Sequence, residues 1–379
     1  MKRRARDFGI PFAGTCGKYN AITDVPGVEV GFCTVNYGEP AEDTLPGSDF
    51  ARTGVTAILP RGKRRSAVFA GRADLNGNGE LTGTHWIDDS GFLHGPVMIT
   101  NTNSVGIVRD TVSKWMVDNH YYFPAYADGH ELPGLGYFYP AVGETFDGTL
   151  NNVNGFKVEP EHVLQALEGA ASGPVAEGNV GGGTGMCCLG FKGGTGTASR
   201  ICRSTFGAEY TVAALVQANF GTREDLTIRG IPVGRLIRGH ERRIPAPAPK
   251  EGEGSIIAVF ATDAPLLPWQ LSKLARRATI GIGRVGGGNH SGSGDIFLAF
   301  STANENAFSY THTNVELLAD QEMDCLFAAA SEVVEESILN ALVAAEDMLG
   351  RNMNFVPALP HDQLQEICRT YAGLFKAYE

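Results

Sequence analysis

The sequence lacks the short patterns that define most metalloenzymes and serine hydrolases. None of its seven cysteines forms a Cys-x-x-Cys pair, and its nine histidines form no His-Glu-x-x-His motif. Zinc sites draw their ligands from such spacings, so we expect no metal site. No serine stands in Gly-x-Ser-x-Gly and none has a lysine three residues later, which disfavours nucleophile-elbow esterases and Ser-x-x-Lys enzymes. A catalytic serine in this chain would need another means of activation.

Positive charge and long apolar runs are also scarce. The chain has 31 Lys and Arg residues against 42 Asp and Glu, a net charge of -11, so a nucleic-acid partner is not expected. No apolar run approaches the roughly 18–20 residues that span a bilayer, and the basic start at Met1–Asp7 leads into no hydrophobic signal core. We expect no membrane contact and a cytoplasmic protein whose cysteines, odd in number, are free thiols.

Glycine, by contrast, is abundant. Nine of the 19 residues in Gly178–Gly196 and seven of the 14 in Gly281–Gly294 are glycine. The excess has no collagen period and accompanies 43% hydrophobic residues. We therefore expect a folded protein in which glycines mark tight turns and places where backbone segments approach closely.

Short apolar runs bounded by glycine, proline or asparagine predict β-strands. Several of these runs are apolar at every position, as in strands that are covered on both faces. The expected strands are Gly54–Leu59, Ser66–Ala70, Pro96–Thr100, Tyr210–Ala218, Ile231–Ile237, Ser255–Ala261 and Asp295–Ser301.

Helical patterns lie between and after these runs. Apolar residues at three- and four-residue steps predict an amphipathic helix that begins at Pro268. A longer helix is expected at about Leu317–Leu349, with a capping box in Thr313–Glu316 and Gly350 as its C-cap. A last short helix is expected at Asp362–Ala372.

One segment, Ile244–Gly254, has the composition of an exposed linker. Its three prolines favour an extended, solvated backbone, and its two glycines and three charges make it flexible and polar. It stops abruptly at Ser255, where a strongly β-forming sequence begins. This change is the clearest boundary in the chain.

The Gly254-Ser255 junction suggests how a serine could be activated. The Ser255 hydroxyl could attack the Gly254 carbonyl in an N-to-O acyl shift, and water would then release a new chain. Glycine leaves that carbonyl unhindered and tolerates a strained backbone. The new chain would begin with a free α-amine, whose pKa of roughly 7.7–8.0 suits a base near neutrality. Gly-Ser is also common at ordinary loop-to-strand junctions, so these two residues alone leave both interpretations open.

Eight segments, spread in order over nearly the whole chain, match one known family. They are Tyr19–Gly31, Glu177–Met186, Phe191–Arg200, Gln217–Gly221, Gly254–Ile257, Ala261–Pro268, Leu274–Arg277 and Ser293–Thr302. In these segments the chain resembles the DmpA-type L-aminopeptidase/D-alanyl-esterase/amidase family, which includes the β-peptidyl aminopeptidases.

The resemblance implies a role for each matching polar residue. Ser255 corresponds to the nucleophile that is exposed when the precursor cleaves itself after Gly254. Asn219 is similar to the asparagine that stabilises the oxyanion. Ser293 resembles the second serine, which hydrogen-bonds the nucleophile, and Asp295 stands where relatives carry an acidic residue that supports it.

The substrate site is implied in the same way, with one departure. Glu144 resembles the acidic residue that binds the free amine of the substrate. Some members have a tyrosine where this chain has Phe146, and that phenol assists the oxyanion. Because Phe146 cannot donate a hydrogen bond, we expect either Tyr137 or Tyr139 to take over this role or the role to be absent.

The resemblance also implies a fold and an assembly. The expected fold is an α/β (α+β) sandwich of two packed β-sheets flanked by helices, like the N-terminal-nucleophile hydrolases but with different strand connectivity. Residues 1–254 would form an α chain and residues 255–379 a β chain within one domain. Each chain would thus have the other as a partner, and αβ units would assemble into a homo-oligomer.

The expected activity is that of a self-processing serine aminopeptidase, amidase and esterase without a cofactor. It would release N-terminal amino acids from short peptides, amides and esters through an acyl-enzyme on Ser255. Two alternatives remain open. One is a related acyltransferase of the ornithine acetyltransferase type, although that family uses threonine where this chain has Ser255. The other is an unprocessed, inactive homologue that only binds small molecules.

Overall fold

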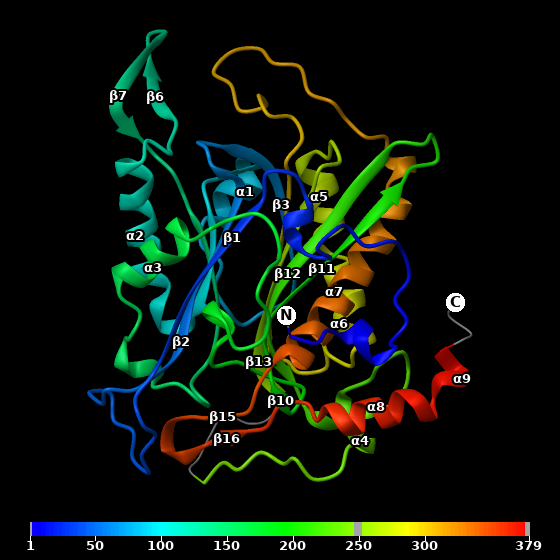
Figure 1. Ribbon diagram of the computed structural model, residues 1–379. Coiled ribbons are helices and arrows are strands. Elements are labelled where there is room, and N and C mark those ends of the chain that lie inside the picture. Colours follow the sequence, from blue (N-terminus) through cyan, green and yellow to red (C-terminus); the bar gives the residue numbers. More distant parts are fainter. Residues whose placement is uncertain (1, 246–251, 376–379) are drawn as a thin grey trace.

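Two β-sheets pack face to face, and helices cover their outer faces (Figure 1). The computed structural model describes residues 2–245 and 252–375. The expected sandwich of two sheets flanked by helices is confirmed.

The larger sheet has six strands in the order β11-β12-β13-β14-β3-β4. The pairing is antiparallel except between β13 and β14, which run parallel. Strands β13 and β14, which lie almost wholly after residue 254, occupy the centre of this sheet between two pairs of earlier strands, so neither part of the chain could complete it alone. The bounds are β3 Ala67–Gly77, β4 Phe92–His94, β11 Gly194–Arg203, β12 Glu209–Gly221, β13 Gly252–Thr262 and β14 Gly294–Ser301.

The smaller sheet has four strands in the order β1-β2-β5-β8, with β5 and β8 parallel. Apolar side chains fill the space between the two sheets: Ile58, Val97 and Ile99 belong to the same buried cluster as Ile257 and Leu298. Both faces are covered in the middle of this sheet, where the runs Ala57–Leu59 and Val97–Ile99 are apolar at every position and fully buried. The bounds are β1 Glu29–Tyr37, β2 Ala51–Lys63, β5 Val97–Asn101 and β8 Ala141–Thr145.

Helices complete the sandwich on both sides (Figure 1). Helices α2 (Val105–Asp118) and α3 (Pro160–Glu168) pack on the smaller sheet, and α5 (Pro268–Ala275), α6 (Ala278–Arg284) and α7 (Asp324–Ala344) pack on the larger one. Short helices and paired strands lie around this framework. They are α1 Thr84–Ser90, α4 Val233–Leu236, α8 His361–Thr370, α9 Ala372–Phe375, β6 Pro124–Ala127, β7 His130–Gly136, β9 Cys187–Cys188, β10 Phe191–Lys192, β15 Met348–Leu349 and β16 Phe355–Val356.

Three expectations about local structure are wrong. Ile231–Ile237 is not a strand, since it contains the single helical turn α4 after Pro232. The long helix is shorter than Leu317–Leu349: α7 begins at Asp324 and ends at Ala344, before Gly350. Thr313–Glu316 therefore caps no helix; Glu316 instead bonds to Asn304 through its backbone.

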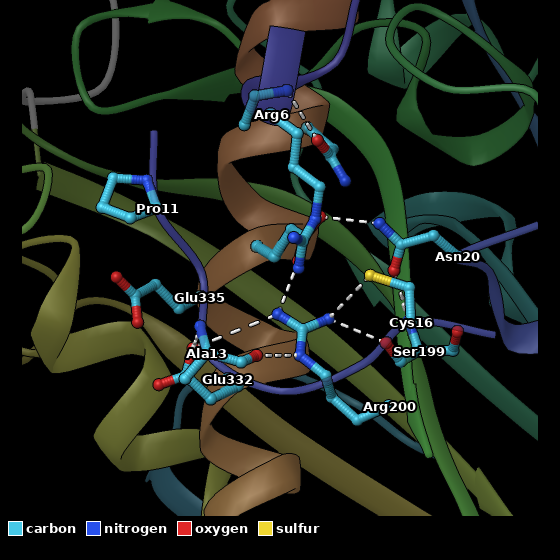
Figure 2. A network of polar contacts seen from close by, with 12 residues as sticks. Arg6, Pro11, Ala13, Cys16, Asn20, Ser199, Arg200, Glu332 and Glu335 are labelled. Carbon is cyan, nitrogen blue, oxygen red and sulfur yellow. Dashed lines mark hydrogen bonds and ion pairs between the residues drawn. The ribbon is translucent and has the colours of Figure 1, made fainter. Parts of the chain in front are cut away.

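Helix α7 is held by ion pairs that are largely buried (Figure 2). The guanidinium of Arg200, on β11, lies 2.6 Å from Glu336 Oε2, and Arg6 binds the other oxygen of the same carboxylate at 2.7 Å. Arg229 lies 2.9 Å from Glu332. Because Arg6, Arg200 and Arg229 precede residue 254 whereas Glu332 and Glu336 follow it, this network joins the two parts of the chain.

In the part of the chain that the structure describes, no helix is both long enough and apolar enough to span a membrane.

Candidate active site

Ser255 lies in β13, which is paired with β12 on one side and with β14 on the other. Its antiparallel partner on β12 is Asn219, and its parallel partner on β14 is Gly294. The Ser255 side chain is buried, with 3% exposure. Strand β13 already begins at Gly252, three residues earlier than expected, because Gly252 continues the ladder by pairing with Gly221 across a bulge. The sheet therefore fixes the backbone on both sides of the Gly254-Ser255 bond.

The backbone packs too closely around Gly254 for any side chain. A Cβ atom at this position would lie 1.9 Å from the carbonyl oxygen of Asn219 and 3.0 Å from Phe220 Cα. Both are backbone atoms that cannot move without disrupting β12. Glycine is therefore required here for steric reasons, in addition to leaving its own carbonyl unhindered.

The side-chain amide of Asn219 is held in one orientation by two backbone groups. The Cys187 N–H donates to Asn219 Oδ1 at 2.8 Å, and Asn219 Nδ2 donates to the Phe146 carbonyl at 2.9 Å. Since one partner is a donor and the other an acceptor, both require the same amide orientation. An amide nitrogen carries two hydrogens, so one N–H remains for a third partner.

Ser293 and Asp295 lie together at the beginning of β14. Ser293 Oγ donates to Asp295 Oδ1 at 2.6 Å, and Asn76 Nδ2 lies 3.4 Å from Asp295 Oδ2. Both Ser293 and Asp295 are buried. Burial raises the pKa of the Asp295 carboxyl, and the hydrogen bonds from Ser293 and Asn76 only partly oppose this.

Glu144 comes from the smaller sheet, near the end of β8. Its Oε1 accepts the Glu80 N–H at 3.0 Å, and its Oε2 accepts the hydroxyl of Thr102. Only 4% of the residue is exposed, and no cation pairs with it among the residues that the structure describes. Burial raises the pKa of Glu144, while the hydrogen bonds from Thr102 and Glu80 oppose this. A buried carboxylate of this kind is well suited to bind an ammonium group from a ligand.

Gly79 lies between Glu144 and the strand ends around Ser255. A Cβ atom at Gly79 would lie 3.0 Å from Glu144 Oε1 and 3.7 Å from the Cα of Gly294, which pairs with Ser255. The Glu144 carboxylate and the backbone of β14 beside Ser255 thus both lie next to Gly79, although they belong to different sheets. A side chain at Gly79 would fill the space between them.

The aromatic candidates are exposed, whereas the polar candidates are buried. Phe146 is 39% exposed, and its backbone carbonyl, not its ring, contacts the site by accepting from Asn219. Tyr137 is 58% exposed, and its ring contacts Trp86 and Tyr139. Neither tyrosine makes a described hydrogen bond to Ser255 or Asn219, so a phenol that assists an oxyanion here stays a prediction.

Several groups around the site were not found from the sequence. They are the side chains of Asn76 and Thr102 and the backbone N–H of Cys187. Each reaches the site through strand register or loop packing, for which a single sequence carries no local signal. His290 also lies nearby: its ring bonds Asp225 at 3.0 Å, while its carbonyl accepts from Asn76.

The described residues hold no group of three or more His, Cys, Asp or Glu side chains that could bind a metal ion. The arrangement is instead a serine beside an oriented amide, with a hydroxyl–carboxylate pair and a second buried carboxylate nearby. Combined with a sandwich of two sheets between helices, these features define a hydrolase of the N-terminal-nucleophile fold class.

A model of peptidase family S58 matches residues 20–356, and the chain belongs to this family. It is 50% identical to the β-peptidyl aminopeptidase BapA of Sphingosinicella microcystinivorans over 386 aligned positions, which cover 99% of this chain and 94% of that protein. It is 44% identical to the enzyme of the same name from Sphingosinicella xenopeptidilytica, with coverage of 97% and 91%.

Solved structures agree with this assignment. The L-aminopeptidase D-Ala-esterase/amidase of Ochrobactrum anthropi, described as a prototype serine aminopeptidase with a variant of the Ntn hydrolase fold, superposes with a TM-score of 0.87 at 47% identity, covering 98% of this chain and 99% of that one. A β-aminopeptidase from a Burkholderia species superposes with a TM-score of 0.82 at 44% identity, covering 97% and 99%.

The protein is therefore a hydrolase of the aminopeptidase class, as the sequence predicted. These relatives are named as aminopeptidases, one of them also as a D-Ala-esterase/amidase, so neither an acyltransferase nor an inactive binding protein is favoured.

Proposed function

We propose that the chain is a self-processing aminopeptidase in which Ser255 is both the agent of maturation and the catalytic nucleophile. The observation that carries this proposal is the position of Ser255 directly opposite Asn219, with a sterically required glycine before it. A nucleophile next to an oriented amide donor is the minimal arrangement for attack on a carbonyl.

Maturation would use the peptide bond between Gly254 and Ser255. Ser255 Oγ forms a bond to the Gly254 carbonyl carbon, and the C–N bond breaks as the nitrogen takes up a proton, which leaves an ester. Water hydrolyses the ester and releases the Gly254 carboxylate. The products are an α chain of residues 1–254 and a β chain of residues 255–379, which share the six-stranded sheet.

Substrate hydrolysis would then proceed in two steps. Ser255 Oγ attacks the substrate carbonyl as its proton passes to the new α-amine, and the remaining N–H of Asn219 stabilises the oxyanion. The amine returns the proton to the leaving group. Water then hydrolyses the acyl-enzyme ester by the same route, which releases the acyl group as a carboxylic acid and restores the Ser255 hydroxyl. Ser293, bonded to Asp295, would orient the Ser255 hydroxyl and amine.

Glu144 would select substrates with a free amine, because its buried carboxylate gains most from an ammonium partner. The substrates would be short peptides, amides and esters of amino acids. The relatives include enzymes named for β-peptides and for L-amino acid and D-alanyl derivatives, and we include β-amino acid derivatives among the substrates here. A cytoplasmic location and a homo-oligomer of αβ units stay predictions.

Denaturing mass spectrometry tests the proposal directly. Purified wild-type protein should give two chains, of 254 and 125 residues, which add up to the 379 of the precursor. Ser255→Ala should give a single 40.3 kDa chain without activity. Aminopeptidase activity from an uncut wild-type chain would refute the mechanism.

A further inference from the structure

Lys192 is a fully buried lysine near the candidate site. It lies on β10, with 0% exposure, and its Nζ donates to three backbone carbonyls: Met186 at 2.7 Å, Gly193 at 2.9 Å and Gly183 at 3.4 Å. Among the described residues no carboxylate pairs with it. A buried ammonium without an anionic partner is costly in free energy and needs an explanation.

One of these carbonyls belongs to a peptide unit that also contacts Asn219. The Met186 carbonyl accepts from Lys192 Nζ and from the Gly193 N–H at 2.9 Å. The N–H of the same Met186-Cys187 peptide donates to Asn219 Oδ1 at 2.8 Å. Lys192 and Asn219 are therefore the two ends of a hydrogen-bonded chain that passes through a single peptide group.

A cation at the carbonyl end of a peptide strengthens the donor at its N–H end. Hydrogen bonds in a chain polarise one another, and they do so more in a low-dielectric interior than in water. The Cys187 N–H then withdraws electron density from Asn219 Oδ1, which makes the amide nitrogen of Asn219 a better donor. The same bonds fix the orientation of the loop and of the amide.

We propose that Lys192 is a positioning residue for catalysis: its ammonium, acting through the Met186-Cys187 peptide, orients the Asn219 amide and strengthens its donation to the oxyanion. This inference rests on the proposed function, in which Asn219 is that donor. Lys192 itself does not touch the substrate.

The residue type fits this role. An ammonium has three tetrahedral donors and no acceptor, so it can bind three carbonyls that converge on one point. The titratable groups that interact with it are the Cys187 and Cys188 thiols and the Lys2 ammonium, none of which is a carboxylate. Burial lowers the pKa of Lys192 to about 8, so its charge changes within the range in which such an enzyme can be assayed.

Lys192→Met tests the inference, because methionine removes the charge and all three donors at similar length. For processed enzyme, quantified by mass spectrometry, kcat should fall about tenfold to hundredfold, less than the loss of an oxyanion donor itself, with KM changed less than about twofold. Lys114→Met, which removes an exposed lysine on α2, is the matched control and should behave as wild type.

The pH profile provides a readout that a merely structural lysine would not change. With a β-amino acid p-nitroanilide, whose amine stays protonated into the alkaline range, wild-type kcat should decline above about pH 8 as Lys192 loses its proton. In Lys192→Met this decline should be absent. A decline that persists in the variant would overturn the inference.

Asn219→Ala separates this inference from the proposed function. If Asn219→Ala inactivates the processed enzyme while Lys192→Met keeps wild-type kcat, the role of Lys192 is refuted and the proposed function stands. If processed Asn219→Ala keeps full activity, Asn219 is not the oxyanion donor, and both that part of the proposed function and the role of Lys192 fail. If Lys192→Met does not fold, the pH dependence of wild-type kcat still tests the inference. A kcat that stays constant from pH 8 to 10 would overturn the role of the Lys192 ammonium.

Discussion

Asn219 and Ser255 face each other across two neighbouring strands of the six-stranded sheet. The side chain of Asn219 is fixed by Cys187 and Phe146, and the backbone of Ser255 is fixed by β12 on one side and β14 on the other. Groups carried on strands are held more precisely than groups on loops. The proposed nucleophile and oxyanion donor are therefore in register before any substrate binds.

The first prediction concerns the Asn219 amide. Asn219→Ala should lower kcat about 10²- to 10³-fold with little change in KM, because the donor acts mainly on the charge that develops in the transition state. The measurement is steady-state kinetics on processed enzyme. Asn36→Ala, at an exposed position on β1, is the control. A variant that raises KM and keeps kcat would show that Asn219 binds the ground state instead.

The second prediction concerns Glu144. Glu144→Gln keeps the size and removes the charge, so KM for amine-bearing substrates should rise about tenfold to hundredfold, the loss of one charge-assisted hydrogen bond. The preference for a free amine over an N-acetylated amine should shrink by the same factor. Because burial raises the pKa of Glu144, wild-type binding should weaken as the pH falls through that raised value, and the variant should lack this dependence. Equal KM values in both enzymes would exclude Glu144 from amine binding.

Apolar runs predicted most of the strands, since runs covered on both faces are visible without a structure, whereas the sandwich itself was implied by the resemblance to a family. Prediction from the sequence failed where local pattern and tertiary context disagree. Ile231–Ile237 is a mostly apolar run, but it contains a single helical turn that packs in the main core. Glutamates usually lie on a solvated helix face, yet three on α7 are buried against arginines: Glu332, Glu335 and Glu336.

The residues of the candidate site could likewise be predicted only in part. Segments that resemble a family identified Ser255, Asn219, Ser293 and Asp295, and the structure brings these four to one end of the larger sheet. Their partners were not predictable, because they are set by non-local register. Asn76, for example, lies 219 residues from Asp295 in the sequence and meets it only because β3 pairs with β14.

The third prediction concerns Asp295. Its carboxyl accepts from Ser293, and burial raises its pKa. If the ionised form orients Ser293, activity should rise as the pH increases through this raised value. Asp295→Asn should lower kcat at every pH and remove that acidic limb. The pH dependence of kcat measures this, and an unchanged acidic limb in the variant would assign the limb to another group.

The fourth prediction concerns the ion pairs that hold α7. Arg200 is 2% exposed and lies 2.6 Å from the fully buried Glu336, so Arg200→Met leaves a buried carboxylate with one partner fewer. Removing one member of a buried pair costs about 3–5 kcal/mol. Urea unfolding should show this loss in a Ser255→Ala background, which is expected to keep the chain in one piece. Arg203→Met, which breaks the exposed pair with Glu209, should cost less than about 1 kcal/mol.

The effect of Arg200→Met should depend on pH. Burial raises the pKa of Glu336, but the hydrogen bond and charge of Arg6 and the charge of Arg200 outweigh it and leave the pKa below the ordinary 4.5. A carboxyl whose pKa is lowered by folding contributes stability that is complete above its unfolded value and is lost as the pH falls through the folded one. The difference in unfolding free energy between the parent and Arg200→Met should therefore be constant near neutrality and narrow in acid, as Glu336 becomes protonated in both folded proteins. A difference that stayed constant into acid would show that Arg200 stabilises α7 through packing of its side chain and not through its charge.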